Sequence, residues 1–109
     1  MATKVNLIMD QGASFDSSFT VLDVDENPID LSNYSAISVM KKTYTSMTSY
    51  AFTVNAYSNG NINLTMSSDD TLQIPAGRYV YDVEVTETSL GLKSRIAEGM
   101  ITVTPAVTT

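Results

Sequence analysis

The chain has 109 residues and a formal net charge of −6, and it contains no Cys, His or Trp. This length predicts a single domain, residues 1–109, with one modest hydrophobic core. The missing Cys and His exclude disulfides, thiolate or imidazole metal sites, and catalysis by either residue. Twelve acidic residues against six basic ones leave no basic surface to neutralise phosphates, so we expect no nucleic-acid partner.

The first half of the chain alternates between apolar and polar side chains, a pattern typical of half-buried strands. We predict four strands here, at residues 4–9, 14–24, 35–42 and 51–57. Turn formers separate the first three: Gln11-Gly12 follows the first strand, and Asp25-Glu26-Asn27-Pro28 follows the second. No apolar run in the chain is long enough for a signal-peptide core or a membrane span, so we expect synthesis in the cytoplasm and no membrane partner.

The second half begins with a predicted strand at residues 61–67. It forms a hairpin with residues 51–57, because Asn59-Gly60 favours a type I′ turn. Residues 67–72 predict at most one helical turn, in which Ser or Asp caps the start. Two longer strands follow, at residues 77–86 and 96–104, and Pro105 ends the last.

The strand at residues 77–86 shows the clearest alternation. Tyr79, Tyr81, Val83 and Val85 share the predicted core face, so we expect both tyrosine hydroxyls to reach backbone partners. Val80 is the one apolar exception on the other face. We also expect Gly99 to permit a bulge or a close approach of a neighbouring strand.

Seven short strands joined by turns predict an all-β fold, an immunoglobulin-like two-sheet antiparallel β-sandwich. The Cys and Trp residues of antibody domains are absent, so this likeness concerns architecture alone. A small barrel is the alternative.

One acidic segment could supply calcium ligands. Asp23, Asp25, Glu26 and Asp30 place four carboxylates within eight residues, and calcium prefers six to eight oxygen ligands. The spacing lacks the regular pattern of a calcium-binding loop. We therefore favour a solvated turn and expect no cofactor.

Three carboxylates on the last two long strands raise the question of glycosidase chemistry. Asp82, Glu84 and Glu98 should come close if these strands pair, but such catalysis needs two carboxyl groups in a cleft. A sandwich of this size offers little room for a cleft. We expect Arg78 and Arg95 to pair with these acids instead, and we expect no enzymatic activity.

Four tyrosines near predicted turns could form a surface for sugars: Tyr34, Tyr44, Tyr50 and Tyr57. Sugar platforms favour Trp, which the chain lacks, so we regard glycan binding as a minor alternative.

The sequence resembles small structural proteins of tailed bacteriophages and prophages over nearly its whole length. The resemblance rests on QGASF near the start, PIDL at residues 28–31, LTMSSDDTLQIPAGRYVYDVE in the second half, and RIAEGMITVTPAVT near the end. The sequence is also similar to the immunoglobulin-like N-terminal domain of phage upper-baseplate proteins, through residues 28–31 and 75–79.

The resemblance implies a non-enzymatic virion protein of the tail, baseplate or neck, present in many copies and bound to other virion proteins. A capsid decoration protein and a host-glycan adhesion module are the alternatives. Assembly would use β-augmentation or edge packing, together with burial of exposed Tyr and Met side chains. We expect the contacts in residues 43–50 and 105–109, and specifically at Tyr44, Met47, Tyr50, Pro105 and Val107.

Overall fold

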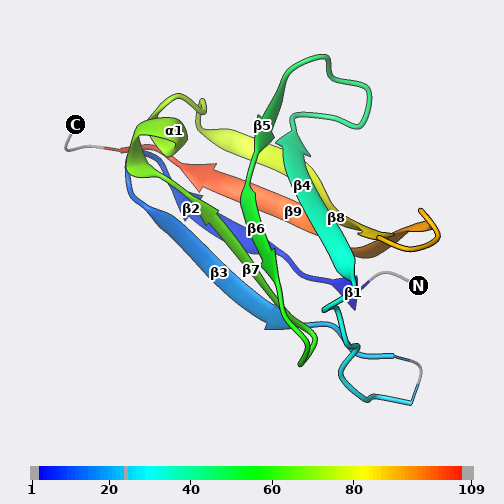
Figure 1. Ribbon diagram of the computed structural model, residues 1–109. Helices are drawn as coiled ribbons and strands as arrows, with labels where there is room; N and C mark the ends of the chain where they lie inside the picture. The colour runs from blue at the N-terminus through cyan, green and yellow to red at the C-terminus, as the bar shows by residue number, and fades with distance from the viewer. Residues whose placement is uncertain (1–2, 24, 107–109) are drawn as a thin grey trace.

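The computed structural model describes residues 3–23 and 25–106, which fold into two facing β-sheets and one short helix (Figure 1). The larger sheet has the strand order β1-β9-β8-β4-β5, and β2 also pairs with β9; the smaller sheet has the order β3-β7-β6. The nine strands within the described residues are β1 (Thr3–Lys4), β2 (Leu7–Asp10), β3 (Phe15–Thr20), β4 (Tyr34–Lys41), β5 (Ser49–Ala51), β6 (Thr53–Ala56), β7 (Asn61–Met66), β8 (Gly77–Glu87) and β9 (Lys93–Thr104). The predicted all-β two-sheet sandwich is confirmed, and the described strands form two open sheets rather than a barrel.

The predicted first strand is two strands, and both run parallel to β9. The wholly antiparallel arrangement that we expected is therefore wrong along this edge. Between β1 and β2, the Val5 N–H donates to the Glu98 carbonyl oxygen (2.9 Å). Gly99 makes this approach possible, since a Cβ there would collide with the Val5 carbonyl oxygen. The predicted close approach at Gly99 is confirmed.

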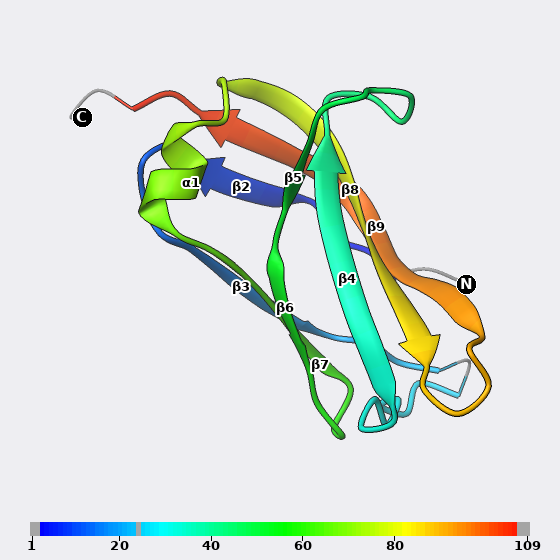
Figure 2. The same ribbon diagram turned by 45° about the horizontal axis from the view of Figure 1, so that its top comes forward.

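The predicted strand at residues 51–57 is divided between the two sheets. β5 pairs with β4 in the larger sheet, whereas β6 pairs with β7 in the smaller one (Figure 2). Phe52 lies at the crossing, where its N–H donates to the Ser38 carbonyl oxygen (3.0 Å). Its ring is buried against Phe15 and Tyr81, with centroid distances of 5.6 and 6.4 Å. One run of alternating sequence thus joins both sheets.

The predicted β6–β7 hairpin is confirmed, but its turn differs from the type I′ turn that we expected. The Gly60 N–H donates to the Tyr57 carbonyl oxygen (3.0 Å), and the Tyr57 N–H donates to that of Asn61 (3.0 Å). Gly60 has a φ of 80°, whereas Asn59 does not have a positive φ. A three-residue loop with glycine in the left-handed region explains these bonds.

The strand predicted at residues 14–24 is shorter, because β3 ends at Thr20 and the chain then turns. Beyond it, Leu22 forms only an isolated bridge to Pro28. The predicted helical turn is confirmed as α1 (Ser68–Leu72). The Ser67 hydroxyl caps it by accepting from the Asp70 N–H (3.3 Å). The buried Thr71 hydroxyl donates to the Ala13 carbonyl oxygen (2.8 Å), which ties α1 to the turn after β2.

The core lies between the two sheets. Alternate side chains of β8 fill it, including Tyr79, Tyr81 and Val83, as the sequence predicts. The register between β8 and β9 shifts at Val83/Glu84, so that β9 carries one extra residue there. This bulge explains why the consecutive residues Ile96 and Ala97 are both buried.

Candidate protein-docking surface

The outer face of the larger sheet carries several exposed apolar side chains. Side chains alternate between the two faces of a strand, so every second residue of β4, β8 and β9 points away from the core. Val80 is opposite Met100 on one side and Lys41 on the other, while Val39 is opposite Asp82. We define the outer apolar patch as Ile8, Ile37, Val39, Val80 and Met100.

The patch is accessible to a partner. Ile8 and Ile37 are 71% and 65% exposed, and Met100 is 38% exposed. Such side chains lose contact with water only when another molecule covers them. The patch therefore offers apolar area for a protein contact.

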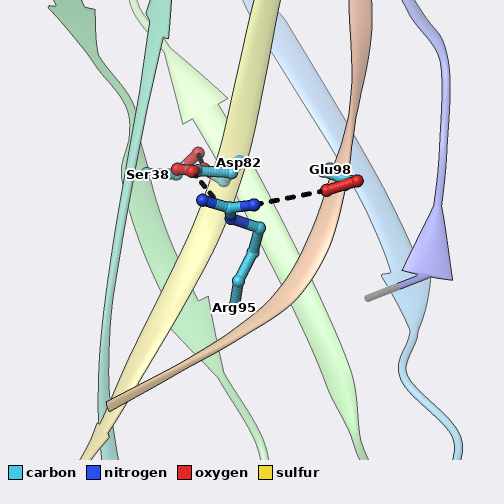
Figure 3. A network of polar contacts seen from close by, with 4 residues as sticks. All are labelled: Ser38, Asp82, Arg95 and Glu98. Atoms are coloured by element: carbon cyan, nitrogen blue, oxygen red, sulfur yellow. Dashed lines mark hydrogen bonds and ion pairs between the residues drawn. The ribbon is translucent and has the colours of Figure 1, made fainter. Parts of the chain in front are cut away.

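An ion-pair cluster of Asp82, Arg95 and Glu98 is drawn in Figure 3, and Asp82 is opposite the patch residue Val39. Asp82 and Glu98 occupy directly opposed positions on β8 and β9. The Arg95 guanidinium lies between them, with Nε 3.2 Å from Asp82 Oδ2 and Nη1 3.6 Å from Glu98 Oε2. The predicted Arg95 pairing is confirmed, whereas Arg78 forms no ion pair within residues 3–23 and 25–106.

This cluster differs from the carboxylate pair of a glycosidase. Asp82 and Glu98 share one arginine on an open sheet face, and their side chains are 36% and 28% exposed. Glu84 is opposite Arg95 in the strand register, but no ion pair joins the two. The arrangement can orient a charged or hydrogen-bonding partner beside the apolar patch.

The β4–β5 loop, residues 42–48, projects from one end of the larger sheet (Figure 1). Met47 is 99% exposed and Tyr44 is 74% exposed. Tyr44 also lines a shallow hollow with Val39, Lys41, Val80, Asp82 and Arg95. This loop residue therefore extends the outer face, and its contact with a partner stays a prediction.

Tyr50 was predicted to be an exposed contact residue, but it is half-buried in β5. It is opposite Met40, a core residue, and its ring packs edge-on against Tyr79 at a centroid distance of 6.2 Å. Tyr50 lies within β5, which begins at Ser49, and not in the preceding loop. Its side chain therefore points to the core, as that of the opposed Met40 does. Its aromatic face belongs mainly to the core.

Tyr79 and Tyr81 bind backbone groups through their hydroxyls, as the sequence predicts. The Tyr79 hydroxyl donates to the Pro75 carbonyl oxygen (2.7 Å), and the Tyr81 hydroxyl donates to that of Val5 (2.6 Å). Burial raises the pKa of Tyr81 to about 12. Burial, with a smaller effect of Tyr50, also raises the pKa of Tyr79.

The predicted C-terminal contact region is described only as far as residue 106. Pro105 is exposed, and the neighbouring Ala106 N–H donates to the Gln11 side-chain oxygen (3.2 Å). Val107 lies outside the described residues.

The four carboxylates considered for calcium do not come together. No group of three acidic side chains within the described residues is arranged to hold a metal ion. Asp23 Oδ1 instead accepts from the N–H groups of Asp25 and Asn27, at 2.9 and 3.0 Å. Asp30 Oδ1 accepts from the Ser32 N–H (2.9 Å), and hydrogen bonds from Ser32 lower the pKa of Asp30.

The outer face of the smaller sheet is polar. Asn63 donates through Nδ2 to Asp16 Oδ1 (2.7 Å) and to the Ser18 hydroxyl (2.9 Å). A shallow hollow beside them is lined by Ser18, Tyr57, Ser58, Asn59, Asn61 and Asn63. Tyr57 is 48% exposed there, whereas Tyr34 is packed against the core. Of the four tyrosines considered for sugars, Tyr57 has the most polar surroundings.

Most residues of the outer apolar patch carry no signal in the sequence that marks them as functional. Within this patch, only Val80 stood out in the sequence, as the apolar exception in an alternating strand. Leu90 and Leu92, which are 68% and 61% exposed near the β8–β9 turn, were not predicted to be exposed. Leucines beside Gly91 in a turn were the available signal.

No helix within the described residues is long and apolar enough to cross a membrane.

Comparison with known proteins supports the fold through structure and not through sequence. No protein-family model matches the chain, and no curated protein matches it. A solved structure titled the N-terminal domain of phage TP901-1 ORF48 is similar at a TM-score of 0.61 and 10% identity, over 91% of this chain and 84% of that one. InlP of Listeria monocytogenes is similar at a TM-score of 0.52 and 8% identity, over 94% of this chain but 28% of that one. At such identities the likeness concerns the fold.

Proposed function

We propose that this protein is a non-enzymatic structural component of a tailed-phage virion. It assembles into the tail, baseplate or neck through protein–protein contacts, in multiple copies around a symmetry axis. The observation that carries the proposal is the outer apolar patch, on a fold that a phage protein domain shares over most of both chains.

The chemistry of the outer face supports a docking role. A stable protein interface combines a central apolar area with polar groups at its rim. The outer apolar patch supplies the first, and the Asp82–Arg95–Glu98 cluster supplies the second. Tyr44 and Met47 add exposed side chains of types that are enriched in interfaces.

Incorporation into particles tests the proposal. A phage that lacks this gene is complemented with wild-type protein or with Ile37→Asp or Met47→Asp, and the purified particles are analysed by mass spectrometry. We expect wild-type protein in the particles and a loss of at least about tenfold for Ile37→Asp, because a charge is buried without a partner. Asn55→Asp, on the outer face of the smaller sheet, is the matched control and should be incorporated normally.

Two results would contradict the proposal. One is the absence of wild-type protein from purified particles. The other is equal protection from hydrogen exchange, in the free protein and in the particle, at residues 42–48 and on the outer face. Detection on the capsid instead of the tail would identify the protein as a decoration protein with the same docking chemistry.

A host-glycan adhesion module is the second candidate function, and the polar hollow around Tyr57 favours it. Amide groups of Asn61 and Asn63 can bind sugar hydroxyls while the Tyr57 ring stacks on the sugar. Saturable chemical-shift changes at these residues with a panel of sugars would support it. Unchanged chemical shifts with every sugar would exclude glycan binding. Turnover of a polysaccharide by the pure protein would contradict the non-enzymatic proposal.

A further inference from the structure

The free edge of β3 is the longest unpaired edge of an outer strand in the described structure. β3 has six residues, whereas the other outer strands, β5, β6 and the interrupted pair β1 and β2, have at most four each. β3 pairs with β7 along one side without a register shift, and no described strand pairs along its other side. Figure 1 shows β3 at the border of the molecule. Such an edge presents backbone groups to another chain.

The hydrogen-bond pattern identifies the residues that face this edge. The Val21 N–H donates to the Gly60 carbonyl oxygen (2.8 Å), at a position that continues the Thr20–Asn61 register. Residues of an antiparallel strand alternate between the two edges. The backbone groups of Phe15, Ser17 and Phe19 therefore face β7. Those of Asp16, Ser18 and Thr20 face the free edge.

The usual devices that block edge pairing are missing from β3. The strand contains no Pro, Lys or Arg. Its one charge, on Asp16, accepts the Asn63 side-chain N–H (2.7 Å), so the carboxylate is held toward β7 and away from the free edge. Natural proteins that stay monomeric usually block a free strand edge with charged residues, proline or a bulge. The free edge of β3 has no proline, no bulge and no charge directed at it.

We propose that β3 pairs with β3 of a second copy, antiparallel about a two-fold axis at Ser18. This register places Ser18 opposite Ser18 of the other copy and Asp16 opposite Thr20. All three edge-facing residues then find a partner, and no two acids are opposed. An axis at Ser17 would instead place Thr20 opposite Ser14, which lies outside the strand. The two smaller sheets would join into one continuous sheet of both copies.

This inference deepens the proposed function, because it names one contact between copies, but it can be tested without particles. Sedimentation velocity of the purified full chain should show a concentration-dependent dimer. Ser18→Lys should shift the protein to monomer, because the axis brings the two lysines together. Thr53→Lys, which adds the same charge on the exposed face of β6, is the matched control and should leave the dimer intact.

Single-cysteine variants detect the proposed contact directly, whatever a substitution does to the stability of the fold. The chain has no other Cys that could form a disulfide. Opposed residues of a hydrogen-bonded antiparallel pair lie about 5.5 Å apart at Cα, within reach of a disulfide. Ser18→Cys should therefore form a covalent dimer on mild oxidation, and Thr53→Cys should not. A wild-type protein that stays monomeric at all concentrations overturns the inference, as does equal cross-linking of the two variants. Absence of the wild-type protein from purified particles, with an intact dimer in solution, would count against the proposed function alone.

Discussion

Single backbone contacts explain several residues that the sequence marked as unusual. Gly99 is required by the close passage of Val5, and Gly60 by a positive φ of 80° in the hairpin. Tyr81 is required by its hydrogen bond to the Val5 carbonyl oxygen (2.6 Å). Gly99 and Tyr81 both act at Val5, in the segment between β1 and β2, which is also held by the Val5–Glu98 backbone hydrogen bond and by the Asn6 side chain.

Tyr81→Phe should lower the free energy of unfolding by about 1–2 kcal/mol, because the Val5 carbonyl loses its side-chain donor while the ring remains. Urea unfolding followed by circular dichroism measures the change. Hydrogen exchange should accelerate most at residues 3–10. A uniform acceleration over all strands would contradict this local assignment.

Gly99→Ala should lower the free energy of unfolding by about 1–3 kcal/mol, because the new Cβ collides with backbone that cannot move without breaking the β9 pairing. Gly91→Ala is the matched control. It has open space around it but a φ of 70°, so its cost, about 1 kcal/mol, is conformational alone. Thermal unfolding of both variants separates the two causes. Gly99 has no positive φ, so an unchanged stability of Gly99→Ala would show that steric contact there contributes nothing.

Pairs of elements, rather than single strands, determine the outer surface. β8 and β9 place Asp82 opposite Glu98, an unfavourable pair of like charges, and the bulge between the same strands positions Arg95 to neutralise them. The crossing from β5 to β6 at Phe52 determines which neighbouring residues face the core. Tyr50 is half-buried because it lies in β5 opposite the core residue Met40, while Tyr44 in the preceding loop remains exposed.

Arg95→Met should lower the free energy of unfolding by less than about 1 kcal/mol at low salt, because two partly exposed like charges are left opposed. The difference from wild type should shrink as salt is added, since salt screens this repulsion. Arg78→Met removes the same charge from β8 and is the matched control. Chemical unfolding at two salt concentrations measures both variants, and identical salt dependence would contradict the role of the cluster.

The two outer faces of the molecule differ in composition. That of the larger sheet mixes the outer apolar patch with charged residues, including Lys41, Arg78, Glu84 and the ion-pair cluster, and that of the smaller sheet is rich in Asn, Ser and Thr. The core between the two sheets contains Tyr79 and Tyr81, whose hydroxyls donate hydrogen bonds to backbone carbonyl oxygens. Burial of these groups makes the stability of the entire sandwich sensitive to alkaline pH.

Stability should fall as the pH rises above about 10. Burial raises the pKa of Tyr81 to about 12 in the folded state, whereas an exposed tyrosine titrates near 10. The folded protein therefore keeps its proton where the unfolded chain loses it. This contribution is complete below about pH 10 and is lost as the pH rises to about 12. Tyr81→Phe should flatten the decline measured by urea unfolding between these values, and an unchanged slope would contradict the assignment.

The sequence by itself determined the local elements of this protein. Period-two alternation in residues 77–86 identified the core tyrosines and Val80. Ser67 with Asp69 and Asp70 identified the helical turn, and residues 51–67 identified the hairpin. These predictions succeeded because strand faces, caps and turns depend on neighbours close in the chain.

Only the tertiary structure decided which strands meet when they are distant in the chain. Alternation does not show that residues 51–57 change sheets, that the first strand runs parallel to β9, or that Ile8, Ile37 and Met100 gather with Val80 on one surface. Each of these features joins residues far apart in the sequence through backbone pairing, whose hydrogen bonds are the same for every residue type except proline. Side-chain patterns therefore indicate which face is buried, but not which strand lies alongside.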